Sequence, residues 1–140
     1  MWPSRGSRSW YCLPGLLVAG ALLVSDKKYN VDIFVGIGGG PEGVITATAL
    51  DTMNCNFQGR LIFETDEAKV RAKEMGIKDL NKKYEINEII SGDSIFCATG
   101  ITSGDLVSGI IINEDEFISE TFVTHKESGL KKVFKLKQNI

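Results

Sequence analysis

Histidine and cysteine are scarce in this chain of 140 residues. His125 is the single histidine, and the three cysteines, Cys12, Cys55 and Cys97, form no CxxC pair. An odd number of cysteines without such a pair argues against a disulfide framework and against a cysteine zinc site. We therefore interpret the cysteines as buried thiols in a reducing compartment, and His125 as a strand or surface residue rather than a metal ligand.

Long basic runs are also missing. The 16 basic and 18 acidic residues give a net charge of −2, and no basic cluster provides the electrostatic footprint of a nucleic-acid-binding protein. The apolar run at residues 13–24 is shorter than the ~20 residues that a membrane span needs. We therefore expect a cytoplasmic protein with neither nucleic acid nor a membrane as a partner. Arg5 and Arg8 before this run resemble the start of a signal peptide, so export remains a weaker alternative.

Strand and helix patterns alternate in the first half of the chain, as they do in an α/β layer. With 43% hydrophobic and 24% charged residues, the composition is that of a soluble globular protein. The apolar, β-branched residues 31–37 indicate a buried strand, and Pro41 is suited to open the helix that follows. The predicted strands are 31–37 and 58–63, and the predicted helices are 41–54 and 66–76, the second with Thr65 as its N-cap.

The second half of the chain is richer in strands. A short helix at 87–90 with Asn87 as its cap and a strand at 94–98 are expected first. Polar turns then separate three strands, which favours an antiparallel meander over residues 110–112, 117–123 and 130–136. Lysines alternate with apolar residues in the last of these strands, as on a solvated strand face. We therefore predict one mixed α/β unit from about residue 31 onward.

The glycine-rich segment at residues 36–43 is the strongest candidate for chemistry. Glycines between a strand and a helix let the backbone approach an anion, and the helix start offers free N–H groups and the positive end of the helix dipole. Glu42, expected at the second helical position, would repel a phosphate unless a divalent cation lay between them. The alternative is a tight turn in which Glu42 only complements the dipole. Neither a GxGxxG fingerprint nor a Walker loop is present.

Two other chemical interpretations are weaker. Serine, histidine and aspartate all occur, but no GxSxG motif indicates a hydrolase triad, and no catalytic residue is assigned. We interpret Arg60, next to Gly59, as an exposed strand residue, with phosphate binding as the open alternative.

Four segments together resemble the C-terminal part of the class II, bacterial-type fructose-1,6-bisphosphatases. They are GIGGGPEGV at 36–44, NFQGRL at 56–61, GIKDLNKKY at 76–84 and SGDSIFCATGITSGDLVSGI at 91–110, and the resemblance covers roughly residues 18–134. It implies an α/β, mixed-sheet layered fold of the lithium-sensitive sugar-phosphatase type. It also implies hydrolysis of the 1-phosphate of fructose 1,6-bisphosphate with Mn²⁺ or Mg²⁺, and a homo-oligomer. The family's metal-binding glutamate falls on Glu42, and its substrate-contacting glycine falls on Gly39.

The sequence also departs from this family. The resemblance implies further metal carboxylates in the family's N-terminal half, including an Asp-Gly-Thr motif, and these have no counterpart here. Residues 15–17 stand where the family has an Asp-Gly-Asp substrate loop. We therefore expect residues 1–17 to be an unrelated, disordered leader and residues 18–140 to be the C-terminal α/β part of a fructose-1,6-bisphosphatase, inactive alone. The alternative is a non-catalytic anion-binding or assembly module.

Overall fold

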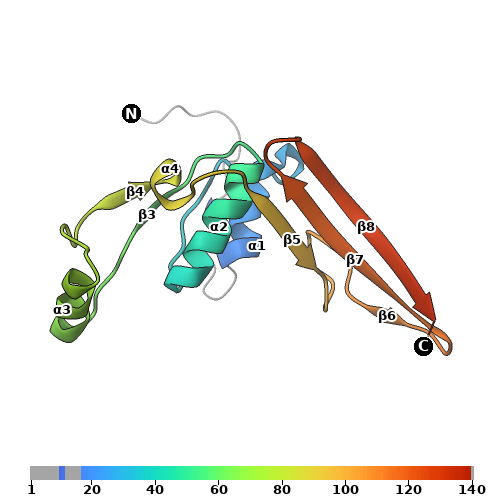
Figure 1. Cartoon of the computed structure of the whole chain (residues 1–140). Coiled ribbons are helices and arrows are strands. Elements are labelled where there is room, and N and C mark those ends of the chain that lie inside the picture. Colours follow the sequence, from blue (N-terminus) through green and yellow to red (C-terminus); the bar gives the residue numbers. More distant parts are fainter. Residues whose placement is uncertain (1–9, 12–16, 140) are drawn as a thin grey trace.

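A computed structural model of the chain describes residues 10–11 and 17–139 (Figure 1). It is a mixed α/β arrangement whose larger sheet is antiparallel. In chain order the elements of the first half are β1 Trp10–Tyr11, α1 Leu17–Leu22, the 3-10 turns η1 Leu23–Ser25 and η2 Lys27–Tyr29, β2 Ile33–Phe34, α2 Gly40–Thr52, β3 Gln58–Arg60 and α3 Asp66–Glu74. The second half consists of β4 Lys83–Glu85, α4 Ile86–Ile89, β5 Ile95–Thr99, β6 Ile111–Ile112, β7 Glu116–His125 and β8 Leu130–Asn139.

The core forms where α1 and α2 pack together and α2 lies on the sheet of β5 and β7. Small residues on the helices allow this close approach, and Phe96 and Phe122 of the sheet fill the space above them with an edge-to-face contact at 6.4 Å between ring centroids. The helices and the sheet thus share one apolar cluster. Its buried members are Ala21, Leu22, Ala49, Leu50, Phe96 and Phe122.

Strand β7 is the centre of the larger sheet. One side of β7 pairs with β5 over Thr121 to His125 and with β6 over Phe117 and Ile118, and the other side pairs with β8 along its whole length. All three pairings are antiparallel. The predicted meander is therefore confirmed, with β8 as a long edge strand (Figure 1).

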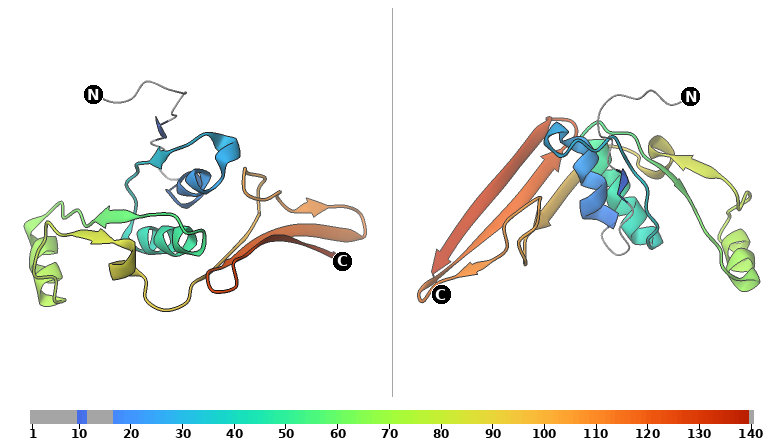
Figure 2. Two further views of the ribbon diagram at one scale, coloured as in Figure 1. Left: turned by 90° about the horizontal axis from the view of Figure 1, so that it is seen from above. Right: turned by 180° about the vertical axis from the view of Figure 1, so that it is seen from behind.

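Strands β3 and β4 form a separate antiparallel pair, and α3, which lies between them in the sequence, is located away from the core (Figure 2). As predicted, Thr65 is the N-cap of α3, and its side chain accepts a hydrogen bond from the Ala68 N–H at 3.2 Å. The short helix α4 begins at Ile86, so the prediction that Asn87 caps it is wrong. Glu85 occupies the cap position instead, and its N–H donates to the Glu88 carboxylate at 3.0 Å.

The buried strand predicted at 31–37 is much shorter than expected. Only Ile33 and Phe34 form β2, which pairs in parallel with the two residues of β1. Ile33, Val35 and Ile37 are 46%, 55% and 75% exposed. The apolar pattern does form a strand, but this strand pairs with a neighbour only at Ile33 and Phe34. The strand predicted at 58–63 likewise ends at residue 60.

Three further predictions concern the cysteines, the leader and membrane spanning. Cys97 is exposed and Cys55 half-buried, so the prediction of buried thiols is wrong for both, while Cys12 lies outside the described residues. Of the predicted leader, residues 10–11 form β1 and Leu17 begins α1, while the rest lies outside the described residues. No helix in the described ranges 10–11 and 17–139 is both long and apolar enough to cross a membrane.

Candidate functional site

The glycine segment connects β2 to α2. The helix begins at Gly40, with Gly39 as an N-cap in extended conformation (φ −68°, ψ 160°) and without a side-chain cap. Pro41 therefore occupies the second helical position and Glu42 the third, one position later than the sequence predicted. The difference has a simple cause, since glycine accepts helical dihedral angles and the helix can extend back to it.

The start of α2 offers backbone donors to an anion. The first helical bond runs from the Gly43 N–H to the Gly39 carbonyl at 3.0 Å. The N–H groups of Gly39, Gly40 and Glu42 precede it and have no carbonyl within the helix to bind, while Pro41 has no N–H. These donors and the positive end of the helix dipole lie at the same place, which is the general arrangement of helix-terminal phosphate sites.

Gly39 and Glu42, the two predicted site residues, are in direct contact. A Cβ atom built on Gly39 would overlap the Oε2 atom of Glu42, whereas one built on Gly40 or Gly43 would meet open space. The absence of a side chain at position 39 therefore permits the Glu42 carboxylate to fold back over the N-cap. The carboxylate itself is exposed, so it can reach a ligand held at the helix start.

Two hollows border this segment. A recess of about 420 Å³ is lined by Leu17, Ile37, Gly39 and Glu42. A larger open groove of about 1420 Å³ runs from the glycine segment past the start of α2 to β3 and α4, and Arg60 lines it. Arg60 is the last residue of β3 and is exposed within this groove, which agrees with its interpretation as an exposed strand residue.

Glu42 belongs to no group of three or more potential metal ligands within the described ranges 10–11 and 17–139. Among the described residues, one group of three such side chains is close enough to hold an ion, and it does not include Glu42. Mn²⁺ and Mg²⁺ take several oxygen ligands, of which this part of the chain supplies one. The described residues alone therefore do not build the metal site that the resemblance implies, and no catalytic step can be derived from them.

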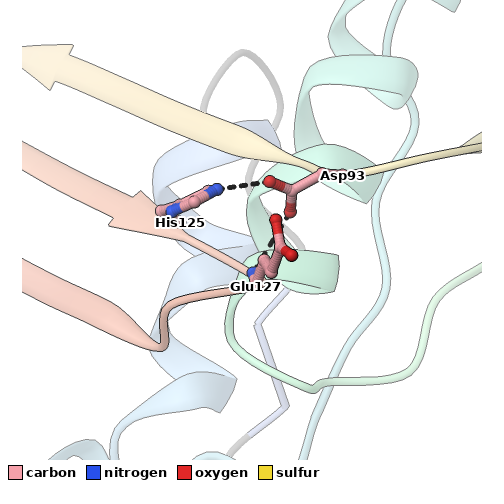
Figure 3. Close-up of side chains that lie close together, drawn as sticks. All are labelled: Asp93, His125 and Glu127. Carbon is pink, nitrogen blue, oxygen red and sulfur yellow. Dashed lines mark hydrogen bonds and ion pairs between the residues drawn. The ribbon is translucent and has the colours of Figure 1, made fainter.

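The group that does converge is Asp93, His125 and Glu127 (Figure 3), whose ligand atoms lie within 4.8 Å of one another. His125 Nε2 contacts the Asp93 carboxylate, and Nδ1 hydrogen-bonds to Ser128 Oγ at 2.8 Å. Asp93 Oδ1 also accepts the N–H groups of Ser94 at 2.9 Å and Glu127 at 3.1 Å. The hydrogen bond with His125 is the largest of the effects that hold the pKa of Asp93 below its ordinary value.

The hydrogen bonds of this cluster link the turn between β7 and β8 to the residues just before β5. Both ring nitrogens of His125 are engaged within it, which agrees with the interpretation of His125 as a strand residue. The sequence analysis missed Asp93 and Glu127 as its partners. The sequence carries no signal for these partners, because they meet only through the antiparallel register that sets Ile95 opposite His125 and brings the residues before β5 next to the turn.

The cluster lies at the opposite end of α2 from Glu42. Asp51, near the C-terminal end of α2, accepts hydrogen bonds from Ser94 Oγ at 2.7 Å and Lys126 Nζ at 2.5 Å. At 1.5 Å of rise per residue, residues 42 and 51 are separated by about 13 Å along the helix. The glycine segment and the cluster are therefore distinct places on the molecule.

Comparison with known proteins gives the family. The family model described as "Bacterial fructose-1,6-bisphosphatase, glpX-encoded" matches residues 16–138. A D-fructose 1,6-bisphosphatase class 2/sedoheptulose 1,7-bisphosphatase of Synechococcus sp. (strain JA-3-3Ab) is 36% identical over 124 residues, which cover 79% of this chain and 36% of the relative. The D-fructose 1,6-bisphosphatase class 2/sedoheptulose 1,7-bisphosphatase 2 of Acaryochloris marina (strain MBIC 11017) is 38% identical over 106 residues, which cover 66% of this chain and 30% of the relative.

These relatives define a class of phosphoric monoester hydrolases that act on sugar bisphosphates. The chain belongs to the bacterial, class II fructose-1,6-bisphosphatase family. The resemblance noted in the sequence is therefore confirmed. The chain spans about a third of the length of the curated relatives that it matches.

Proposed function

We propose that this chain provides the glycine loop and one metal-binding carboxylate of a class II fructose-1,6-bisphosphatase, which hydrolyses the 1-phosphate of fructose 1,6-bisphosphate to give fructose 6-phosphate. The observation that carries the proposal is the contact between Gly39 and Glu42 at the free N-terminus of α2. The names of the relatives extend the proposed substrates to sedoheptulose 1,7-bisphosphate. The layered sugar-phosphatase fold and the cytoplasmic location belong to the same proposal.

The backbone of the glycine segment binds the phosphate in this proposal. The N–H groups of Gly39, Gly40 and Glu42 donate to its oxygens, and the helix dipole favours its charge. Glu42 brings a carboxylate next to the same anion, and the two repel each other unless a cation separates them. When bound, Mn²⁺ or Mg²⁺ would supply that cation and polarise the phosphoryl group.

The chain alone is proposed to be inactive. Metal-assisted phosphoryl hydrolysis needs several carboxylates to hold the metal and orient water, and Glu42 is a single one. The remaining ligands would come from the part of the family fold that this chain does not span. Purified chain with Mn²⁺ should therefore release no phosphate from fructose 1,6-bisphosphate above a boiled control, and turnover above that control would contradict this part of the proposal.

A chimera tests the role of Glu42. Residues 16–138 of this chain would replace the matching segment of the Synechococcus relative, and phosphate release and Mn²⁺ affinity would be measured together. Glu42→Gln should lower turnover by about 100-fold or more and weaken Mn²⁺ binding, because a charged group acting on the reacting phosphate is lost. Glu67→Gln is the matched control, since Glu67 is also a first-turn helix glutamate but lies on α3.

Two other outcomes would change the assignment. If Glu42→Gln left both quantities unchanged, Glu42 would only complement the helix dipole. If orthophosphate bound the isolated chain equally well with and without Glu42, and Mn²⁺ had no effect, the non-catalytic anion-binding module would be the better description. Should the chimera fail to fold, the same Glu→Gln change at the aligned position of the relative gives the same readouts.

A further inference from the structure

The cluster of Asp93, His125 and Glu127 combines the ligand types of a metal site. One imidazole and two carboxylates come together, although Asp93 lies 32 residues before His125 in the sequence. Their ligand atoms lie within 4.8 Å of one another. In a tetrahedral Zn²⁺ site, with bonds of about 2.0 to 2.2 Å, the ligand atoms stand roughly 3.3 to 3.5 Å apart. Side-chain rotations that move these atoms by about 1 Å therefore bring all three to coordination distance.

Hydrogen bonds with neighbouring groups orient two of the three ligands. Asp93 Oδ1 accepts the N–H groups of Ser94 and Glu127, so the other carboxylate oxygen, Oδ2, faces the imidazole. On the far side of the ring, His125 Nδ1 lies 2.8 Å from Ser128 Oγ. When Nδ1–H donates to this hydroxyl, the lone pair of Nε2 is directed at Asp93 Oδ2. Outer partners of this kind fix the tautomer and the direction of metal-binding side chains.

The charge around the cluster favours a divalent cation. The carboxylate of Glu127 turns toward that of Asp93 (Figure 3), and two carboxylates this close repel each other. Asp51 is a third carboxylate nearby, since it accepts a hydrogen bond from Ser94, the neighbour of Asp93. Lys126 offsets one of these three charges, because its Nζ pairs with Asp51. A divalent cation balances both remaining charges, whereas a proton on the imidazole balances one.

The combination of ligands selects the kind of ion. Imidazole suits Zn²⁺ and other late first-row ions, whereas Mg²⁺ and Mn²⁺ prefer carboxylates, carbonyls and water. Zn²⁺ accepts nitrogen and oxygen ligands in the same site, and a water molecule can complete its coordination. One imidazole with two carboxylates therefore points to Zn²⁺ rather than to the ions expected at Glu42.

We propose that Asp93, His125 and Glu127 bind a Zn²⁺ ion that links the turn between β7 and β8 to the residues before β5, with water as the fourth ligand. Neither hollow beside the glycine segment includes these three residues, so the ion stabilises the fold and takes no part in catalysis. It does so because the three ligands come together only in the folded chain. This departs from the sequence-based interpretation of His125, which could not include Asp93 as its neighbour.

Proton NMR of the purified, tag-free chain during a titration with Zn²⁺ tests this proposal. His125 is the only histidine, so its imidazole signals are identified without further assignment. These signals should shift and then saturate as one ion binds per chain. Mg²⁺ at the same concentrations should leave them in place, because Mg²⁺ does not favour imidazole.

Two glutamate variants separate coordination by the cluster from general attraction to acidic groups. Glu127→Gln should raise the dissociation constant for Zn²⁺ by about 10-fold or more, since even the loss of an outer partner has an effect of this size. Glu114→Gln is the matched control, because Glu114 is an exposed glutamate in the turn between β6 and β7. Glu42→Gln should also leave Zn²⁺ binding unchanged, so the result does not depend on the proposed phosphatase function.

Thermal unfolding tests the stabilising role. Zn²⁺ at 100 times its dissociation constant should raise the midpoint of unfolding by roughly 5 °C or more, because the ion binds only the folded chain. His125→Gln should abolish this increase, and its far-ultraviolet circular dichroism without Zn²⁺ shows whether the variant folds. If it does not fold, Glu127→Gln carries the test, because Glu127 is an exposed turn residue.

Three outcomes would overturn the proposal. Zn²⁺ that left the histidine signals unmoved would show that the cluster is only a hydrogen-bonded link, or that thiols hold the ion instead. Equal weakening by Glu127→Gln and Glu114→Gln would identify an adventitious ion only. Binding that moved the histidine signals but not the midpoint of unfolding would contradict the stabilising role.

Discussion

The contact between Asp51 and the sheet should contribute a large part of the stability of this chain. Asp51 is 7% exposed, and its carboxylate accepts the hydrogen bonds from Ser94 and Lys126. Removing one partner of a buried ion pair costs about 3 to 5 kcal/mol. Because the Lys126 side chain is 42% exposed and can return to water, we expect Asp51→Ala to cost less, about 2 to 3 kcal/mol, much of it from the unsatisfied Ser94 hydroxyl.

Urea unfolding at one fixed protein concentration measures this loss. For an m-value of about 1.5 kcal/mol/M, the midpoint should fall by about 1 to 2 M. Glu116→Ala is the control, since Glu116 forms an ion pair of similar length with Lys137 at 2.6 Å but is more exposed. Exposed pairs contribute little, so the control should shift the midpoint much less. Equal shifts in the two variants would refute the role assigned to burial.

Acidification gives an independent test of the same contact. Burial alone raises the pKa of Asp51, but the hydrogen bonds from Lys126 and Ser94 and the charge of Lys126 outweigh it, so the pKa lies below its ordinary value. A lowered pKa contributes stability that is present above the unfolded value of about 4 and is lost as the pH falls through the folded value. The difference between wild type and Asp51→Asn should therefore shrink below about pH 4, and a constant difference would contradict the ion pair.

The remaining predictions concern stability and are checked by the same unfolding assay. The Thr52 hydroxyl donates to the Ala49 carbonyl, so it accepts the hydrogen bond from the fully buried Thr124 hydroxyl at 2.6 Å. Thr52→Val should lower the free energy of unfolding by about 1 to 3 kcal/mol, because the Thr124 hydroxyl loses its partner. Adding Thr124→Val should recover part of this loss. Additive losses would contradict the pairing. Gly129→Ala should lower the free energy of unfolding by about 1 to 2 kcal/mol, because Gly129 has φ at +65°. Gly43→Ala should raise it by about 0.5 to 1 kcal/mol, because Gly43 lies inside α2 with open space at its Cβ position. Opposite signs are the outcome that supports this contrast.

Local signals in the sequence predicted the helices well. The glycines before Pro41 and the apolar spacing after it place α2 within one or two residues, and Thr65 fixes the start of α3 because an N-cap is decided by neighbours within one turn. The meander was predictable for a similar reason, since its strands follow one another with short polar turns. The contact between Gly39 and Glu42 is also local, since both residues lie at the first turn of α2, and their roles in binding substrate and metal stay predictions.

Long-range pairings account for what the sequence did not predict. The pattern at residues 31–37 is that of a buried strand, but burial depends on a neighbour, and β1 covers only two residues of it. Cys97 was expected inside, yet the residues beside it, Phe96 and Ala98, take the inner face, so the alternation of β5 turns Cys97 outward. His125, Asp93 and Glu127 meet because two strands pair, and single residues carry no signal of that pairing.

Helix α2 connects the glycine segment, which local sequence determines, with the sheet, which long-range pairing determines. Its C-terminal end is held by buried polar contacts of Asp51 and Thr52 with the sheet, whereas its N-terminal end carries Glu42 in an exposed position beside open hollows. The anchored end determines how the helix lies on the sheet, and the free end depends on contacts within one turn. Asp51→Ala should therefore lower stability without disturbing the contact between Gly39 and Glu42, which separates the part of the chain that maintains the fold from the part proposed to bind phosphate and metal.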